Sequence, residues 1–540
     1  MGPYSSLPIS HLLTTMTRSR WLLILLFVFL YGLDLALPRD LWVQDEARYG
    51  EVVREMVTEG DWLVPHLNGY PYPDKPALYF WLVAGVGAVV GHGEFAFRLV
   101  TFASTAAAAV GVYLVALQLL GGSAAFWAGA AFLTAFLTLV VGHIMRMDML
   151  LTVAGVYAWY SLLCWRAKAS AAQERQERGG ELAAFWVFTA LGLMVKGPIA
   201  LLFTLLPAFI WSAWEDGPRG VRALRPVTGV LMLLALVGSW IGAVAMAGEG
   251  AYLSRIWHEQ LVGRAVSSWS HREPLWFYLV LLPLLVMPWA ALLPIGVRHL
   301  YREQSSVLRS TVSFTLPPLV SLSLLSGKLF LYLEPLFPGL AVIAGAAAAL
   351  RLVGGERVAP AVGWSPVLFF GLLAIGVGYG ADRYLDAERQ AGLAIAVALL
   401  VAAGVAAVVA RAPGRYWLGT HLTLAVVFSW VVFGVLITLM TPLYSGRALG
   451  EYLAHELPAT VPVGIVNTTR GVLNYYAGRI FVELNSGEAN AWRAAHPGAA
   501  LIVPKSVLSD VFGPTGIPGD CRIHRAFTVE MKEYHVVADC

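Results

Sequence analysis

Long apolar runs recur along most of this 540-residue chain, and they constrain its fold more than any other feature. Examples are Trp21 to Leu30, Phe126 to Val141, Ile199 to Trp211 and Leu418 to Met440, which with their flanks approach the roughly 20 residues needed to cross a bilayer. Only 13% of the residues are charged, whereas a soluble domain carries roughly a quarter. The chain is therefore predicted to be a multi-pass membrane protein, and nothing in it indicates nucleic acid as a partner.

The placement of basic residues predicts the orientation of the spans. Hydropathy gives about fourteen candidates, of which Ala77 to Gly91 is short for a crossing. If this run does not cross, the inter-span loops that carry Arg and Lys, from Arg166 to Arg415, lie on the side of Arg18 and Arg20. That distribution follows the positive-inside rule, so we predict about thirteen spans, with the N-terminus inside and the C-terminus outside.

Three regions follow from this topology. Residues 1–440 are predicted to form an all-α membrane domain, with residues 33–92 as a long first outer loop. Two helical pieces of that loop, Glu46 to Glu59 and Ala77 to Val90, carry Trp and Tyr in and around them and suit the headgroup level. After Met440 hydropathy falls, and residues 441–540 are predicted to form a small α/β domain outside the membrane.

Short periodic runs support the α/β prediction for the C-terminal region. Val463 to Val466, Ala499 to Val503 and Tyr534 to Val537 are typical of strands, and Arg447 to Leu457 is typical of a helix. Cys521 and Cys540 both lie there and could form one disulfide if the region is extracytoplasmic, whereas Cys164 is expected to be inert within a span.

Polar residues gather on the predicted outer side. The first loop holds the run Gln44 to Tyr49, then Asp61, then Asp74-Lys75-Pro76. Later outer loops and span ends contribute Arg146, Asp148, Lys196, His258, Arg264, His271, Arg272, Lys328 and Tyr332. Ionisable groups beside or within a membrane usually serve a function, so this face is the predicted active site.

These motifs resemble the glycosyltransferase C superfamily, in particular the bacterial lipid A aminoarabinose transferases and related protein mannosyltransferase-like enzymes. The matching pieces, in order, are Asp45-Glu46-Ala47-Arg48-Tyr49, Gly60-Asp61-Trp62, Pro65-His66-Leu67-Asn68-Gly69, Lys75-Pro76 with Leu78-Tyr79, Arg146-x-Asp148, and Ser326-Gly327-Lys328 with Tyr332 and Pro335. They cover about the first two-thirds of the chain. One departure is Glu334, which stands where the family carries an apolar residue; it could be a salt-bridge partner of Lys328 or a specificity residue.

The resemblance implies an activity, a donor and a location. It implies transfer of a sugar, with 4-amino-4-deoxy-L-arabinose as a candidate, from a polyprenyl (undecaprenyl) phosphate to an extracytoplasmic acceptor such as lipid A or lipopolysaccharide. The enzyme would lie in the bacterial inner membrane among its lipids, with its active site and C-terminal domain in the periplasm. A protein or another surface glycan remains an alternative acceptor. A secondary transporter is the alternative from another class, disfavoured because no inverted repeat is visible.

The chemistry of such a transfer assigns roles to the polar residues. The leaving phosphate needs cations and polar groups, and Lys75, Arg264, Arg272, Lys328 and Tyr332 are the candidates. Asp45, Asp148 and Glu46 are the catalytic candidates, since a carboxylate can accept the proton of an acceptor hydroxyl.

Each of these residues also has a purely structural interpretation. Asp45 and Asp148 could cap helices, Glu46 could pair with Arg48, and the lysines could extend to water from span ends. His258 and His271 are the candidate ligands for a divalent ion, Zn or Mg, although two histidines without a clear third ligand form a weak site.

Overall fold

The computed structural model describes residues 9–170, 179–256, 273–351, 359–384, 389–468, 470–513, 517 and 521–538. By contacts the chain divides into two units. The membrane unit comprises residues 1–37 and 99–436, and the loop unit comprises residues 38–98 and 437–540. The first outer loop thus clusters with the C-terminal region.

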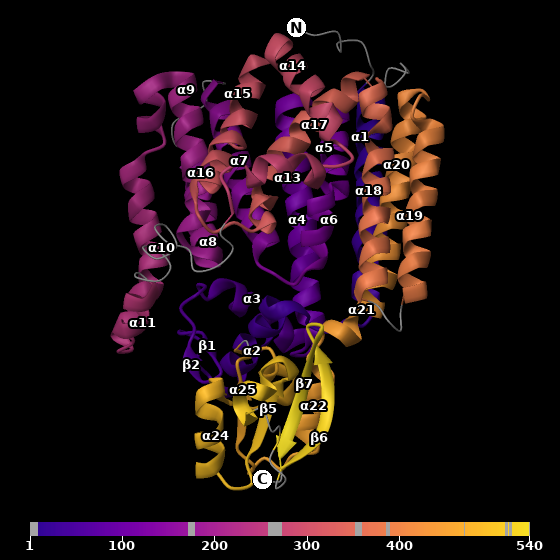
Figure 1. Cartoon of the computed structure of the whole chain (residues 1–540). Coiled ribbons are helices and arrows are strands. Elements are labelled where there is room, and N and C mark those ends of the chain that lie inside the picture. The colour runs from indigo at the N-terminus through magenta and orange to yellow at the C-terminus, as the bar shows by residue number, and fades with distance from the viewer. Residues whose placement is uncertain are drawn as a thin grey trace. The chain divides into compact units, whose positions relative to one another are not determined.

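The regular elements in the described part of the membrane unit are all helices (Figure 1). Its helices in the first half are α1 (Ile9–Ala36), α4 (Glu94–Leu120, which begins in the loop unit), α5 (Gly122–Thr134), α6 (Phe136–His143), α7 (Asp148–Ser170), α8 (Gly179–Lys196), η1 (Gly197–Leu202), α9 (Leu205–Ala223), α10 (Pro226–Met246) and α11 (Gly250–Arg255). In the second half they are α13 (Phe277–Leu285), η3 (Ala290–Leu292), α14 (Leu293–Glu303), α15 (Ser305–Ser313), α16 (Leu316–Leu324), η4 (Phe330–Leu336), α17 (Phe337–Arg351), α18 (Pro360–Tyr384), α19 (Arg389–Val409), α20 (Gly414–Ser429) and η5 (Trp430–Leu436).

Many of these helices are long and apolar enough to cross a membrane. Within the described ranges there are nine, or up to 11 if each of two bent helix pairs is counted as one span. The chain is a multi-pass membrane protein, and the predicted helical class is confirmed. The run at Ala77 to Gly91 forms the short helix α3 (Leu78–Val90) of the loop unit.

Two bends meet inside the membrane unit. The pair α5 and α6 bends by 61° at Ala135, and α13 bends by 102° against the helix that follows it. A bend leaves backbone groups without helical partners, which are costly in a membrane. Here the N–H of Phe136 donates to the carbonyl of Met287 at 3.0 Å, and the indole of Trp289 donates to Thr134 at 2.9 Å, so each bend satisfies polar groups of the other.

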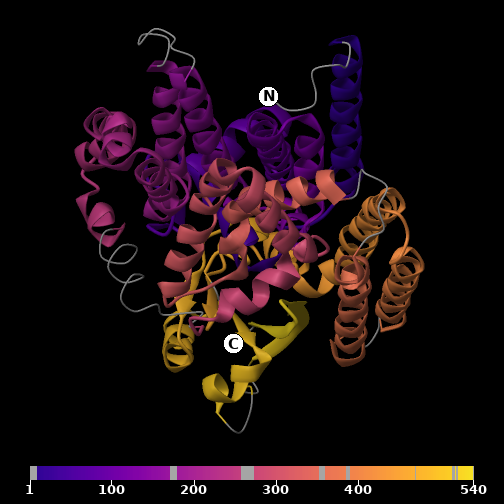
Figure 2. The same ribbon diagram turned by 90° about the horizontal axis from the view of Figure 1, so that it is seen from above.

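Small residues allow close helix packing in this unit. A Cβ atom at Gly345 of α17 would lie 2.7 Å from the carbonyl oxygen of Ala124 on α5, so only glycine permits this approach. Figures 1 and 2 show α18 and α19 running side by side, with α20 beside α19.

The loop unit combines the first outer loop with the C-terminal region. Its elements are α2 (Val43–Glu59), β1 (His66–Leu67), β2 (Tyr70–Pro71), α3, α21 (Ile437–Tyr444), α22 (Arg447–His455), β3 (Val463–Val466), α23 (Asn474–Ala477), β4 (Val482–Leu484), α24 (Ser486–Ala495), β5 (Ala500–Pro504), η6 (Lys505–Val507), α25 (Leu508–Phe512), β6 (Arg522–Val529) and β7 (Lys532–Ala538). The last five strands form one sheet in the order β4-β3-β5-β7-β6. β3 runs parallel to β4 and β5, and β7 is antiparallel to β5 and β6.

The centre of this sheet is buried on both faces. Ala500 and Ile502 of β5 pack into one apolar cluster, and Leu501 and Val503 pack into another. Successive side chains of a strand point to opposite faces, so a strand covered on both sides must be apolar throughout. The predicted strands at Val463 to Val466, Ala499 to Val503 and Tyr534 to Val537 correspond to β3, β5 and β7.

A tight hairpin anchors the first loop within the loop unit. Asn68 and Gly69 connect β1 and β2 with φ angles of 56° and 76°, which suit an Asn-Gly turn. The buried Asn68 side chain accepts from the N–H of Phe481 at 2.9 Å and from Asn474 at 2.7 Å. Both carboxylate oxygens of Glu55, on α2, accept backbone N–H groups of Asn68 and Gly69. The turn therefore connects α2 to the C-terminal region.

Candidate active site

Glu46 lies in the first turn of α2 and is fully engaged by groups of the loop unit. Its carboxylate accepts two hydrogen bonds from Arg39, at 2.5 and 2.6 Å, and one from the backbone N–H of Trp42 at 2.8 Å. Both side chains of the Arg39–Glu46 pair are buried. Glu46 thus holds the start of the helix through Arg39 and Trp42, and this geometry favours its structural role.

Asp45 is the more accessible carboxylate of the pair. The helix begins at Val43, so Asp45 stands in its first turn and is not the N-cap residue. Its Oδ1 lies 3.6 Å from Arg48 Nη1, and its side chain is 27% exposed. A carboxylate with access to solvent can accept a proton or stabilise positive charge.

Arg48 lies between two carboxylates of the first loop. Its Nη2 lies 3.3 Å from Asp74, opposite the contact with Asp45. Burial alone would lower the pKa of Arg48, but nearby Tyr72, Asp45 and Asp74 raise it above its usual value. The guanidinium therefore stays charged and fixes the spacing of the two carboxylates.

Lys75 follows Asp74 in the turn before α3. Its Nζ donates to the backbone carbonyl of Asp74 at 3.1 Å, and its side chain is half-buried. A lysine held by its own turn presents its ammonium group at a fixed place. The position suits the predicted contact with an anionic headgroup.

Asp148 forms the centre of a buried cluster in the membrane unit. It is the first residue of α7, and its two carboxylate oxygens contact Lys196 and, at 3.2 Å, Arg146. The Lys196 ammonium also lies 4.5 Å from the ring centroid of Tyr332. The carboxylate is 1% exposed and lies between two cations. Because both oxygens are ion-paired, Asp148 is better suited to orient the cations than to act as a base.

Lys328 and Glu334 are both buried in the membrane unit but have different partners. Lys328 Nζ donates to the backbone carbonyl of Glu273 at 2.8 Å. Glu334 accepts from the hydroxyl of Thr138 at 3.0 Å. Lys328 and Glu334 therefore have separate hydrogen-bond partners and do not form the suggested salt bridge.

Four predicted site residues, His258, Arg264, His271 and Arg272, lie outside the described residues. Across the described ranges no group of three His, Cys, Asp or Glu side chains is placed to hold a metal ion. Cys521 is disulfide-bonded and Cys164 is free, while Cys540 also lies outside the described residues.

The structure shows partners of the candidate carboxylates that the sequence did not assign. Lys196, Arg39 and Arg48 contact the three predicted catalytic carboxylates, Asp148, Glu46 and Asp45 respectively. The sequence does contain a signal for Lys196, because a lysine at the end of an otherwise apolar helix is costly unless it is paired.

Comparison with known proteins shows the family of the chain. Residues 19–222 match the family model of dolichyl-phosphate-mannose-protein mannosyltransferases. An undecaprenyl phosphate-alpha-4-amino-4-deoxy-L-arabinose arabinosyl transferase of Aeromonas hydrophila is 30% identical over 397 residues, which are 72% of this chain and 71% of that protein. A second transferase of that name, from Pseudomonas fluorescens, is 27% identical over 511 residues, 90% of this chain and 84% of its own length.

The crystal structure of ArnT from Cupriavidus metallidurans bound to undecaprenyl phosphate has the same fold. It superposes with a TM-score of 0.74 at 19% identity, over 99% of each chain. The fold, together with the match to these relatives, identifies a membrane-embedded glycosyltransferase of the C superfamily. The chain belongs to the undecaprenyl phosphate-alpha-4-amino-4-deoxy-L-arabinose arabinosyl transferase family. The predicted enzyme class is confirmed, and the transporter alternative is set aside.

Proposed function

We propose that this enzyme transfers 4-amino-4-deoxy-L-arabinose from undecaprenyl phosphate to lipid A at the periplasmic face of the bacterial inner membrane. The donor and the sugar are those in the names of its relatives. The observation that carries the proposal is the buried cluster of Arg146, Asp148 and Lys196. The formal charges of these three side chains sum to one positive charge, and buried ionisable groups in a membrane protein usually serve a function.

That charge suits the leaving group of the reaction. The bond between the sugar C1 and the phosphate oxygen breaks, its electron pair leaves with undecaprenyl phosphate, and the acceptor oxygen bonds to C1. Negative charge therefore grows on the phosphate, and fixed cations stabilise it most when water is excluded. Lys196 and Arg146, held by Asp148, are proposed for this role, and Lys75 of the first loop is a separate candidate. Arg264, Arg272, Lys328 and Tyr332 remain further candidates for the phosphate.

Asp45 is proposed to act on the acceptor. If the acceptor is a hydroxyl group, its proton passes to the Asp45 carboxylate as the new bond forms. If the acceptor is a phosphate of lipid A, no proton need move, and Asp45 would stabilise positive charge on the sugar ring. Glu46 supports this position by fixing the helix start through Arg39 and Trp42.

The test is transfer by the purified protein in detergent. Synthetic undecaprenyl phosphate-linked aminoarabinose is the donor, lipid A is the acceptor, and mass spectrometry detects the product. A matched reaction receives the same sugar phosphate without the polyprenyl chain. We expect product only in the reaction with the lipid donor. If that reaction gives no product, the proposal is wrong.

A protein acceptor is the second candidate. The match of residues 19–222 to the protein mannosyltransferase model favours it over other surface glycans. The same assay with a membrane-protein extract in place of lipid A separates the two, because only one acceptor would gain the sugar.

A divalent ion on His258 and His271 remains a prediction. Transfer measured after chelation, and again after adding Zn or Mg, would test it. Equal rates in all three samples would remove the ion from the mechanism.

A further inference from the structure

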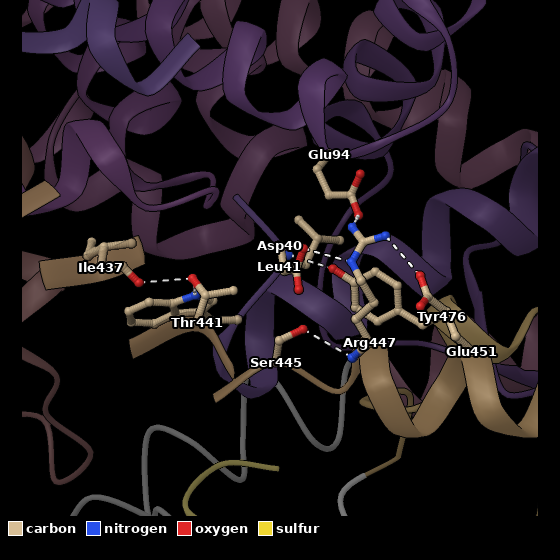
Figure 3. A network of polar contacts seen from close by, with 10 residues as sticks. Asp40, Leu41, Glu94, Ile437, Thr441, Ser445, Arg447, Glu451 and Tyr476 are labelled. Atoms are coloured by element: carbon tan, nitrogen blue, oxygen red, sulfur yellow. Dashed lines mark hydrogen bonds and ion pairs between the residues drawn. The ribbon is translucent and has the colours of Figure 1, made fainter. Parts of the chain in front are cut away.

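Arg447 joins three carboxylates of the loop unit through one guanidinium group (Figure 3). It is the first residue of α22. Its Nε donates to Asp40 at 2.7 Å, its Nη2 to Glu94 at 2.5 Å, and its Nη1 to Glu451 at 3.3 Å. A planar group with five donors can bridge partners in this way, whereas a lysine ammonium cannot reach all three in one geometry.

Two of these partners lie at the ends of the first loop. Asp40 precedes α2, and Glu94 opens α4. The segment between them carries the loop residues that are proposed to act in transfer. Holding both ends on one side chain limits the conformations of the segment that they enclose.

The residues after Asp40 are held by the same part of the chain. The N–H of Leu41 donates to the Tyr476 hydroxyl at 2.7 Å, and the guanidinium of Arg447 packs over the Tyr476 ring. The indole of Trp42 donates to Thr441 at 3.0 Å and stacks on Tyr444. Three consecutive residues are thus fixed to the C-terminal region.

This anchored segment leads directly into the start of α2. The N–H of Trp42 donates to Glu46, and Asp45 occupies the same helical turn. Close packing supports the arrangement, since a Cβ at Gly50 would lie 2.4 Å from Leu41 and 2.9 Å from Tyr475. A shift of residues 40–42 would therefore move Asp45.

We propose that Arg447 is a positioning residue for sugar transfer, which fixes the first turn of α2 and so the place of the Asp45 carboxylate. The inference rests on the proposed role of Asp45. Arg447 acts through the loop ends, and nothing in its own contacts requires it to touch a substrate. Each pair is partly exposed and weak by itself, so the effect lies in the shared anchoring of three carboxylates.

The experiment compares Arg447→Gln, Arg447→Lys and the control Lys505→Gln. Lys505 forms an exposed ion pair with Glu533 in the same unit. Transfer rates are measured per folded enzyme, together with hydrogen exchange of residues 40–60. Arg447→Gln is expected to lower kcat roughly ten- to hundredfold, with a smaller change in donor KM, because misplacement by about 1 Å has an effect of this size.

The exchange data identify the cause. In Arg447→Gln, hydrogen exchange should rise in residues 40–60 but not in β3 and β5. Arg447→Lys should recover part of the transfer rate. The control Lys505→Gln should match the wild type in both measurements. Wild-type kcat and exchange in Arg447→Gln would overturn the inference. If that variant loosens β3 and β5 as well, Asp40→Asn replaces it, and wild-type values there would likewise overturn the inference. If the wild type shows no donor-dependent transfer, the proposed function is refuted instead. Hydrogen exchange of residues 40–60 would then still test whether Arg447 anchors this segment.

Discussion

The buried pair of Asp148 and Lys196 gives a quantitative prediction. The two side chains are 1% and 6% exposed, so removing either one leaves a charge with little access to water. Breaking such a pair costs about 3–5 kcal/mol of unfolding free energy. Because Arg146 remains 3.2 Å from Asp148, we expect the lower end of that range, about 3 kcal/mol, for Lys196→Met.

The double variant reports on the coupling of the two residues. Asp148→Asn alone should also cost about 3 kcal/mol, since it leaves Lys196 and Arg146 without their anion. In the double variant the charges of Asp148 and Lys196 are both absent. Arg146 alone then gives the three-residue cluster a net charge of +1, the same as in the wild type. A coupling of about 2 kcal/mol then predicts a total loss of about 4 kcal/mol, well short of the sum of the single losses.

Denaturant titration of the purified protein in detergent measures these losses, with donor binding measured alongside. The pair of Glu215 and Arg309, which is 16% and 31% exposed, provides a matched cycle in the same unit. Its coupling should stay below about 1 kcal/mol. Lys196→Met should also weaken donor binding, while the double variant recovers part of it. If the single losses in the Asp148–Lys196 cycle simply add, the cluster is not coupled and the argument for its charge fails.

Four further predictions follow from individual residues. Asp45→Asn should retain folding and insertion but lose most sugar transfer, and wild-type rates in that variant would reduce Asp45 to a helix residue. Lys75→Ala should weaken donor binding and Lys75→Arg should keep part of it, which titration with the donor lipid measures. A reporter fused after Gly180 should act as cytoplasmic and one after Ala538 as periplasmic, and the same compartment for both would refute the topology. Burial raises the pKa of Glu51 to about 7, so the folded state holds its proton more tightly than the unfolded state. Stability should therefore fall by up to about 3 kcal/mol as pH rises from 4.5 to 7, and pH titration of unfolding in Glu51→Gln should lack this loss.

Much of the fold could be predicted because it depends on local patterns. Apolar runs that approach the length of a bilayer crossing can only be buried in lipid or protein, and they predicted the helical membrane unit. The helix at Glu46 to Glu59 and the strand at Val463 to Val466 correspond to α2 and β3. Even the shortness of Ala77 to Gly91 was informative, since α3 clusters with the C-terminal region.

Two strands of the sheet escaped prediction for a physical reason. β6 lies at the edge of the sheet and is mostly exposed, so its residues, Arg522–Val529, lack a clear apolar pattern. β4, Val482–Leu484, is too short to show a periodicity. Both strands are defined by hydrogen bonds to β7 and β3, which are tertiary contacts.

The sequence alone identified the carboxylates of the candidate site but not their partners. Asp45, Glu46 and Asp148 could be selected because ionisable groups near a membrane are rarely retained without a role. Only the tertiary structure showed that Glu46 pairs with Arg39 and Asp148 with Lys196. An ion pair depends on where two side chains meet, and for Asp148 and Lys196 that meeting joins two different helices. No local pattern in the sequence records such a distance. Only the folded structure therefore shows that Glu46 and Asp148 are buried in ion pairs, whereas Asp45 is partly exposed.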